Sequence, residues 1–307
     1  MAENSEQKTA FISIVGRPNV GKSSILNAML GTKVAIVSHK PQTTRTRIMG
    51  VLTQEETQLV FIDTPGLLKP RNRLGEYMVK SVLESVSGVD ACLLVEEAGE
   101  EVSPASQELI GKFREQGIPA ILAINKIDLL PDKSVLMAQI AKLSALYPFE
   151  AVVPVSAVKN NGIADLTGEL RKLAQPSAHF FDDDALTDQP ERVVAGEIVR
   201  EKLLRLLSSE VPHGVAVTVD RMSARDDGSG ITDISAVIYC EKESHKGIII
   251  GKNGAMLKKV GTYAREDMEH FFDCKVNLKL WVRVKEDWRN REAALRALGY
   301  DSSNFDG

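Results

Sequence analysis

The feature that most constrains this chain is the stretch Gly16-Arg17-Pro18-Asn19-Val20-Gly21-Lys22-Ser23. It has the pattern G-x-x-x-x-G-K-S, in which backbone N–H groups and a lysine surround bound phosphate. An apolar run at 11–15 precedes it, and a helix-forming run at 24–30, ended by Gly31, follows it. In this order of strand, loop and helix, the helix N-terminus points at the loop. The sequence therefore predicts a phosphate-binding P-loop.

Apolar, strand-like runs alternate with helical patterns through the first ~170 residues, which is typical of an α/β domain with a mostly parallel sheet and flanking helices. The expected strands are 11–15, 47–52, 58–62, 91–95, 119–124 and 151–155. The expected helices are 75–87, 105–116, 133–146 and 163–173. We assign residues 1–175 to this domain.

The pattern changes after residue 175. Two prolines and an acidic cluster predict an exposed linker at 176–190. Residues 191–300 then predict the order helix, two strands, helix, Gly-rich turn, helix, strand, which indicates a second domain of α+β class. Residues 301–307 are expected to be disordered.

Composition limits the function classes. The chain has 307 residues and a formal net charge of −4, so a nucleic-acid site has to be a local basic patch. Its three cysteines lie far apart without metal-ligand spacing, which favours reduced thiols. We see neither a signal-peptide pattern nor an apolar run of about 18 residues. These features predict a cytoplasmic protein.

Three short motifs after the P-loop predict which nucleotide binds. Asp63-Thr64-Pro65-Gly66 follows an apolar strand, where a carboxylate can hold Mg²⁺ and a glycine N–H can reach a γ-phosphate. Asn125-Lys126-Ile127-Asp128 follows the next strand but one, and the Asp128 carboxylate can accept two hydrogen bonds from guanine. Adenine would leave that carboxylate without partners, at a cost of about 1–3 kcal/mol. Ser156-Ala157 supplies a backbone N–H suited to guanine O6.

These motifs, together with Gln42-Thr43-Thr44-Arg45-Thr46-Arg47, resemble the translation-factor-type GTPases and more closely the bacterial Era family. The resemblance implies that GTP and GDP bind with Mg²⁺, that Ser23, Thr44 and Asp63 hold the metal, and that Lys22, Thr44, Gly66 and Asn19 act in catalysis. Thr43 is the alternative to Thr44. The nucleotide contacts implied are Gly16, Arg17, Pro18, Asn19, Val20, Gly21, Lys22, Ser23, Ser24, Asp63, Thr64, Pro65, Gly66, Asn125, Lys126, Asp128, Ser156 and Ala157.

The sequence leaves the source of hydrolytic activity open. Leu67 occupies the position at which Ras-like proteins carry a water-orienting glutamine, so slow intrinsic hydrolysis is expected. In related GTPases an asparagine at the position of Asn19 accompanies a bound K⁺; the alternative is a loop-forming residue. Arg71 and Arg73 are either finger-like or solvated residues of a switch loop, and we favour the second interpretation.

The second domain contains a local basic segment. Residues 246–265 hold five basic residues and no acidic one, around the turn Gly251-Lys252-Asn253-Gly254. A G-x-x-G turn between helices lets a nucleic-acid backbone approach closely, and it is the KH signature for about four nucleotides of single-stranded RNA. The element order matches the type II KH topology. The alternative is a plain connecting turn. The expected RNA-binding residues are Lys246, Gly247, Ile248, Ile249, Ile250, Gly251, Lys252, Asn253, Gly254, Lys258 and Lys259.

A GTPase domain followed by a type II KH domain is the Era architecture, and the resemblance covers essentially residues 8–300. It implies a monomeric GTP-hydrolysing switch that binds the 3′ region of 16S ribosomal RNA and assists assembly of the small (30S) ribosomal subunit. It also allows peripheral association with the inner membrane. The alternatives are an RNA adaptor with little turnover and a membrane-surface signalling GTPase.

Overall fold

The computed structural model describes residues 6–38, 40, 42–67 and 70–300. The chain divides into two compact units, which are described separately. The N-terminal unit comprises Met1–Ala35, Thr44–Pro70 and Gly75–Asp188, and the C-terminal unit comprises Ile36–Thr43, Arg71–Leu74 and Gln189–Gly307. The expected disordered tail at 301–307 lies outside the described residues.

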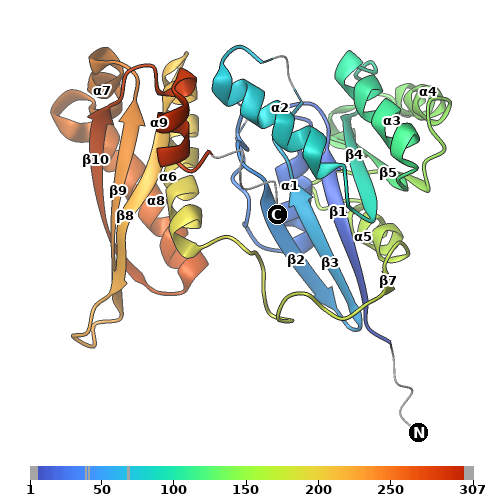
Figure 1. Cartoon of the computed structure of the whole chain (residues 1–307), viewed down its shortest axis with the longest axis horizontal. Coiled ribbons are helices and arrows are strands. Elements are labelled where there is room, and N and C mark those ends of the chain that lie inside the picture. The colour runs from blue at the N-terminus through green and yellow to red at the C-terminus, as the bar shows by residue number, and fades with distance from the viewer. Residues whose placement is uncertain (1–5, 39, 41, 68–69, 301–307) are drawn as a thin grey trace, which may run out of the picture. The chain divides into compact units, whose positions relative to one another are not determined.

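The N-terminal unit is built on one sheet (Figure 1). Its strands lie in the order β2 (Ile48–Gln54), β3 (Thr57–Asp63), β1 (Lys8–Val15), β4 (Ala91–Glu97), β5 (Ala120–Asn125) and β6 (Ala151–Pro154). Edge strand β2 is antiparallel to β3, and the short β7 (Gln175–Pro176) is antiparallel to β1, while the other pairs are parallel. The predicted mostly parallel sheet is therefore confirmed.

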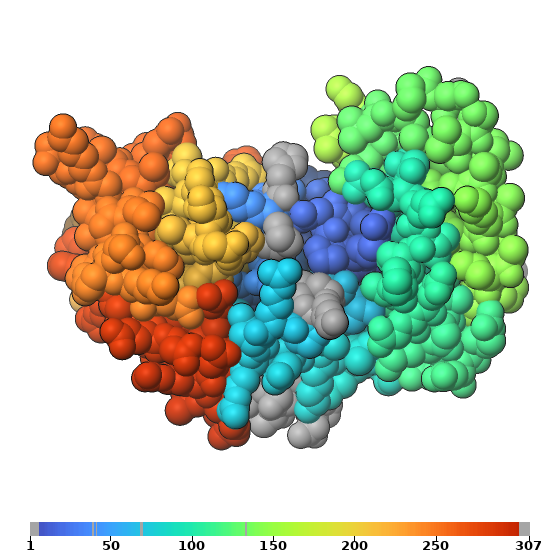
Figure 2. All heavy atoms as spheres, turned by 90° about the horizontal axis from the view of Figure 1, so that it is seen from above, coloured from blue at the N-terminus to red at the C-terminus, as the bar shows by residue number. Residues whose placement is uncertain are grey.

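Helices cover both faces of this sheet. Alternate side chains of each buried strand point to opposite faces, so the strands supply two apolar clusters. One cluster takes in α1 (Lys22–Leu30) and α5 (Ile163–Arg171). The other takes in α2 (Arg73–Ser85), α3 (Pro104–Gln116) and α4 (Lys133–Ser144); α3 and α4 form much of the teal and green surface in Figure 2. A 3₁₀ turn, η1 (Ile127–Leu129), follows β5.

The parallel strands place the polar motifs together. The carboxyl ends of parallel strands share one edge of the sheet, where ligands of such folds bind. The P-loop follows β1, the Asp63 motif ends β3 and the Asn125 motif ends β5. Fold class and site location thus follow from the same alternation of strands and helices.

The segment 176–190, which was predicted to be an exposed linker, has no buried residue but does contact the N-terminal unit. Up to Asp188 it belongs to the N-terminal unit. The Phe180 ring lies edge-on against Phe11, with centroids 5.0 Å apart, and the N–H of Val51 donates to the carbonyl of Leu186 at 3.0 Å. Strand β2 is an edge strand with an unpaired row of backbone groups, and this segment supplies partners for it.

The C-terminal unit has the expected element order. Helix α6 (Glu191–Leu206) is followed by η2 (Val211–Gly214), β8 (Ala216–Ala224), β9 (Ile231–Cys240), α7 (Glu243–Ile250), η3 (Lys252–Gly254), α8 (Ala255–Phe272) and β10 (Lys275–Val284). The sheet order is β10-β9-β8, with β10 parallel and β8 antiparallel to β9. Apolar residues of α6, α7 and α8 pack with this sheet in one core.

Two elements at the end of this unit were not predicted. A 3₁₀ turn, η4 (Trp288–Asn290), and helix α9 (Glu292–Ala297) follow β10. Trp288 is fully buried, and its Nε1 donates to the carbonyl of Gly214 at 3.0 Å. Its ring stacks on Tyr300 at 5.9 Å. Both elements are too short to show a helical period in the sequence, so the sequence did not predict them.

Candidate functional sites

The P-loop connects β1 to α1 in a conformation that its glycines allow. Gly16 and Gly21 have φ angles of 146° and 102°, and non-glycine Asn19 has a φ of 66°. A Cβ on Gly16 would lie 2.4 Å from the carbonyl oxygen of Val95. A Cβ on Gly21 would lie 2.1 Å from the side-chain nitrogen of Asn125. The loop therefore leaves no room for side chains at either glycine, and Asn19 is exposed on it.

Lys22 is held inside the loop. Its Nζ donates to the carbonyls of Gly16 at 3.2 Å and Arg17 at 2.9 Å, and only 6% of the residue is exposed. Burial lowers the pKa of Lys22 to about 8, against the opposing effect of the carboxylates of Asp63 and Glu96. An ammonium with two of its three protons on carbonyls has one left for an anion. The loop thus prepares a cation for a phosphate group.

Three oxygen-bearing side chains converge next to this lysine. The Ser23 hydroxyl donates to Asp63 Oδ2 at 2.6 Å and lies 3.0 Å from the Thr44 hydroxyl, which donates to the same carboxylate oxygen at 3.2 Å. Burial raises the pKa of Asp63, and Lys22, the two hydroxyls and the backbone N–H of Thr64 oppose the shift. The other oxygen, Oδ1, is buried without a hydrogen-bond partner.

This arrangement fits Mg²⁺, a hard cation that prefers one or two carboxylates with hydroxyl, phosphate and water oxygens. The orphaned Asp63 oxygen has an unmet need for a cation or a water. The geometry favours Thr44 over Thr43, because the Thr43 hydroxyl donates instead to the carbonyl of Lys40 at 2.7 Å. Within the part of the chain that the structure describes, no group of three His, Cys, Asp or Glu residues forms another metal site.

The segment after Asp63 packs against the P-loop. The Thr64 hydroxyl donates to the carbonyl of Ile14 at 2.8 Å. A Cβ on Gly66 would lie 2.5 Å from the backbone nitrogen of Pro18, so glycine is required for this approach. The Leu67 N–H donates to the carbonyl of Gly16 at 3.2 Å, while its side chain is buried in the apolar cluster of α2 and α3. Leu67 therefore offers a reacting water neither an acceptor nor a donor.

The arginines near the phosphate motifs have acidic neighbours. Arg17 Nε lies 3.8 Å from a carboxylate oxygen of buried Glu96. Arg73, which belongs to the C-terminal unit, lies 3.6 Å from Glu292 of α9. Arg71 is exposed. Leu68 and Lys69 of the same loop lie outside the described residues, and a finger-like role for either arginine stays a prediction.

The base-side motifs come together between β5 and β6. Asn125 Nδ2 donates to the carbonyl of Val20 at 2.9 Å, and its Oδ1 accepts from the N–H of Ala157 at 3.1 Å. Ser156 donates to Asp128 Oδ1 at 2.5 Å, which fixes the carboxylate orientation. Asn125 is thus a brace between P-loop and base pocket. These hydrogen bonds bring residues of the Asn125 and Ser156 motifs to the P-loop residue Val20.

Lys126 lies at the edge of the base pocket. Its backbone is left-handed, with a φ of 67°, and its Nζ pairs with Glu97 at 2.7 Å. The aliphatic stem of a lysine held at its head by a carboxylate can lie flat beside an aromatic base. Ser24, also predicted as a contact, follows Ser23 in the first turn of α1.

The G-x-x-G turn in the C-terminal unit has the expected backbone. Gly251, Asn253 and Gly254 all have positive φ, at 73°, 52° and 77°. The two glycines serve different purposes. A Cβ on Gly251 would lie 2.7 Å from the Cβ of Met256, whereas nothing lies within 4 Å of a Cβ on Gly254. Gly251 therefore permits packing, and Gly254 faces open space from which a ligand backbone can approach.

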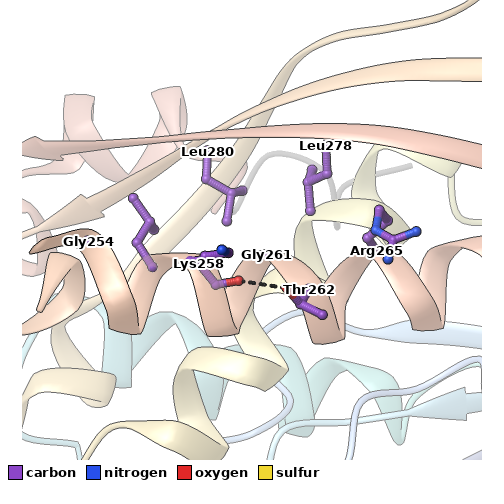
Figure 3. Close-up of a pocket in the computed structure, with 8 residues that line it drawn as sticks. Gly254, Lys258, Gly261, Thr262, Arg265, Leu278 and Leu280 are labelled. Atoms are coloured by element: carbon purple, nitrogen blue, oxygen red, sulfur yellow. Dashed lines mark hydrogen bonds between the residues drawn. The ribbon is translucent and has the colours of Figure 1, made fainter.

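A groove of about 360 Å³ runs from Gly254 along α8. Figure 3 shows Lys258, Gly261, Thr262 and Arg265 on the helix, with Leu278 and Leu280 pointing toward it from β10. Leu257 completes the lining. The leucines suit bases, and the cations Lys258 and Arg265 on α8 suit phosphates.

The groove corrects one expectation. Ile248, Ile249 and Ile250 were expected to bind RNA, but Ile249 is fully buried in the core, Ile248 is half-exposed on α7, and none of the three lines the groove. The apolar side instead comes from Leu257, Leu278 and Leu280. Leu278 and Leu280 were missed because the alternation of β10 alone does not say which of its faces meets a groove. Leu257 and Arg265 could have been found, because they follow Gly254 at helical spacing and so lie on the same side of α8 as the turn.

The predicted basic residues flank this groove to different degrees. Lys246 on α7 lies 3.7 Å from Glu243, and Gly247 beside it is open on its side-chain face. Lys252 is exposed in the turn. Lys259 lies over the Tyr263 ring, 5.9 Å from its centroid, and only Lys258 lines the groove itself.

Comparison with known proteins matches both units. Residues 11–126 match the family model described as 50S ribosome-binding GTPase, and residues 210–289 match the KH domain model. GTPase Era of Ruminiclostridium cellulolyticum is 48% identical over 296 residues, covering 96% of this chain and 98% of that protein. GTPase Era of Clostridioides difficile is 47% identical over 294 residues, covering 96% and 99%. This chain belongs to the GTPase Era family.

Two solved Era structures share the fold over almost the whole chain. A variant of Aquifex aeolicus Era bound to GDP and AlF₄⁻ superposes with a TM-score of 0.91 at 37% identity, covering 96% of this chain and 99% of that one. Era in complex with MgGDPNP and nucleotides 1506–1542 of 16S ribosomal RNA gives the same TM-score, identity and coverage. The resemblance inferred from the motifs is thereby confirmed, as is the P-loop GTPase and KH fold. Among the described residues, no helix is long and apolar enough to cross a bilayer.

Proposed function

We propose that this Era-family GTPase binds GTP and GDP with Mg²⁺ between the P-loop and the motifs at Asp63 and Asn125, and hydrolyses GTP there. The observation that carries the proposal is the convergence of Ser23, Thr44 and Asp63 beside buried Lys22. Relatives with the same fold have been solved with GDP·AlF₄⁻ and MgGDPNP.

Each residue group has a distinct task in this proposal. Bound Mg²⁺ supplies positive charge to the β- and γ-phosphates. Lys22 donates its remaining N–H to the oxygens of the same phosphates, and the N–H groups of the P-loop and of Gly66 orient them. Asp128 accepts from the guanine N1–H and 2-amino groups. Ser156 keeps that carboxylate in place, and Ala157 presents its N–H to O6.

The attacking water needs help from outside the Leu67 position, whose side chain is in the core. We propose that K⁺ near exposed Asn19 supplies that positive charge. The left-handed backbone of Asn19 also fits a purely loop-forming residue, which keeps the alternative open. A GTPase without a cation or activator hydrolyses slowly.

For the C-terminal unit we propose binding of the 3′ region of 16S ribosomal RNA in the α8–β10 groove. Open Gly254, the leucines of the groove and the cations of α8 support it, and a relative has been solved with that RNA. Assistance in small-subunit assembly is the finer proposal, because the 3′ end of 16S RNA belongs to that subunit. Peripheral membrane association and a monomeric state stay predictions.

We further propose that nucleotide state gates RNA binding through residues 36–43, which lead directly into Thr44. This segment is part of the C-terminal unit. Arg200 of α6 donates to the Thr43 carbonyl, and the Val37 N–H donates to the buried carboxylate of Glu201 at 2.9 Å.

The same carboxylate accepts from Lys202 at 3.1 Å, and Lys202 is ion-paired with Asp267 of α8, the groove helix. Arg200, Glu201 and Lys202 are buried, so solvent screens their interactions little. In this proposal a displacement of Gln42 and Thr43, which precede Thr44 in the chain, reaches α8 through bonded neighbours within the C-terminal unit.

Single-turnover GTP hydrolysis tests the enzymatic proposal. We expect slow hydrolysis by the chain alone, and acceleration by K⁺ and by small ribosomal subunits. A rate that none of these additions raises would favour the alternative of an RNA adaptor with bound nucleotide and little turnover. Ser23→Ala is the control variant, because it removes a metal ligand and should abolish the rate under every condition.

A further inference from the structure

The outward face of β10 carries an exposed tryptophan that no site described above uses. Successive side chains of a strand point to opposite faces. Leu278 and Leu280 point into the groove, so Lys279, Trp281 and Arg283 point away from it. Trp281 is 59% exposed, whereas the only other tryptophan, Trp288, is fully buried. A single exposed ring is ordinary on a protein surface, so its neighbours decide whether it marks a contact site.

The residues around this ring are basic. The outward positions of β10 are Lys275, Asn277, Lys279, Trp281 and Arg283, which include three cations and no acid. By register, Trp281 lies opposite Val237 and Arg283 lies opposite Tyr239 of β9. Lys285 lies over the Tyr239 ring, 5.6 Å from its centroid. Trp281 therefore has a cation on either side of it along the strand, and the Tyr239 ring of β9 lies opposite Arg283.

Asp233, an acid on this face, has partners of its own. Asp233 of β9 is paired with Arg225 at 2.8 Å and accepts from Asn277 at 2.6 Å. These hydrogen bonds hold the pKa of Asp233 well below its usual range. Lys279 adds a weaker charge interaction with Asp233, but among the described residues neither Lys279 nor Arg283 forms a salt bridge with an acid, so both cations face an anionic partner.

We propose that the outward row Lys279, Trp281 and Arg283 is a second contact for single-stranded RNA, continuous with the groove on the other side of the same strand. Trp281 stacks on a base, and the two cations contact phosphates on either side of it. Strand β10 is at the edge of its sheet, so RNA leaving the groove meets this row where no further strand covers it (Figure 1). The inference rests on the proposed RNA binding by the groove.

Two oligonucleotides that copy the 3′ end of the small-subunit RNA separate the row from the groove. One has about four nucleotides and fills only the groove, and the other has about 12 and extends past it. In fluorescence anisotropy we expect Trp281→Ala to weaken the longer oligomer about tenfold and to leave the shorter one unchanged. Lys279→Ala and Arg283→Ala should each reduce the salt slope for the longer oligomer by about 0.7.

Two control variants test whether the loss of binding is specific to the Trp281 ring. Met137→Ala removes a similarly exposed apolar side chain, 66% exposed on α4, and should change neither affinity. Trp281→Phe keeps an aromatic face and should retain most of the binding. Unchanged binding of the short oligomer shows that each variant is folded.

Tryptophan emission gives an independent readout. Because Trp288 is buried, RNA stacking should quench only the Trp281 part of the emission, and Trp281→Phe should abolish the quenching. Unchanged affinity of Trp281→Ala for the longer oligomer, with no quenching, would overturn the inference and leave the row to a protein partner. Failure of the unaltered chain to bind even the short oligomer would overturn the proposed RNA function as well.

Discussion

Replacing Lys22 by methionine should separate stability from nucleotide binding. The Lys22 amine is buried, and burial lowers its pKa from 10.5 to about 8. At about 1.4 kcal/mol per pKa unit, keeping this amine charged at pH 7 costs the nucleotide-free protein about 3 kcal/mol. Methionine has a similar length and no charge, so Lys22→Met removes that cost.

The substitution also removes two donors. The carbonyls of Gly16 and Arg17 lose their bonds to Nζ, which costs about 1 kcal/mol each. The balance is a gain of about 1 kcal/mol in the unfolding free energy of the nucleotide-free protein at pH 7. GTP affinity should fall about 100-fold or more, since charge-assisted bonds to phosphate are lost.

The lowered pKa of Lys22 also sets how the unfolding free energy changes with pH. Between pH 8 and 10.5 the unfolded chain holds a proton on Lys22 that the folded chain does not, so the stability of the unaltered protein rises with pH there. The variant lacks this term. Its advantage at pH 7 should therefore shrink, and reverse, as the pH rises through this window.

Urea unfolding of nucleotide-stripped protein at pH 7 and pH 9.5, alongside a labelled-GDP titration, measures both effects. Lys142→Met is the control, because Lys142 is exposed on α4 and its change should leave stability and affinity nearly unaltered. Lys22→Met that is less stable than the unaltered chain by 2 kcal/mol or more at pH 7 would refute the reasoning, because the buried charge would then be stabilising.

Three further predictions concern the base pocket, the cation and the turn. Asp128→Asn should shift preference from guanine toward xanthine nucleotides by about tenfold or more in competition titrations, since an amide cannot accept two hydrogen bonds; unchanged competition between GTP and XTP would contradict the base-pocket assignment. Turnover should be faster in K⁺ than in Na⁺ at equal ionic strength, and Asn19→Ala should erase the difference; equal rates in both salts would leave an activator in trans. Gly254→Asp should abolish binding of single-stranded RNA in anisotropy and leave GDP affinity intact, since the carboxylate occupies the open face of the turn; Gly111→Asp, on an open face of α3, is the matched control, and wild-type-like RNA binding by Gly254→Asp would reduce the turn to a connector.

The nucleotide site was predictable because each of its motifs ends a buried strand. Alternation of apolar strands with helices predicted the parallel sheet, and a parallel sheet brings strand ends to one edge. Asp63 and Asn125 therefore had to lie near the P-loop. The sequence could not show the role of Asn125 as a brace between Val20 and Ala157, because that role depends on distances between loops far apart in the chain.

The groove and the connecting segment were less predictable for a physical reason. Three consecutive isoleucines show no helical period, so the sequence alone did not place Ile249 in the core. The alternation of β10 did not say which of its faces meets α8, so Leu278 and Leu280 were not placed in the groove. The polar residues between the prolines after residue 175 predicted a linker. In the structure the backbone N–H of Val51, on edge strand β2, donates to the carbonyl of Leu186 in this segment. Tertiary contacts decided both cases.

The most direct test of the account is the RNA affinity of one protein preparation in two nucleotide states. Anisotropy with the oligonucleotide of about 12 nucleotides would be measured in saturating GDP and in a saturating non-hydrolysable GTP analogue, both with Mg²⁺. The account predicts affinities that differ by at least about fivefold, with a difference that Glu201→Gln reduces because it weakens the link from Val37 to α8. Equal affinities in the two states would contradict the claim that nucleotide state gates RNA binding.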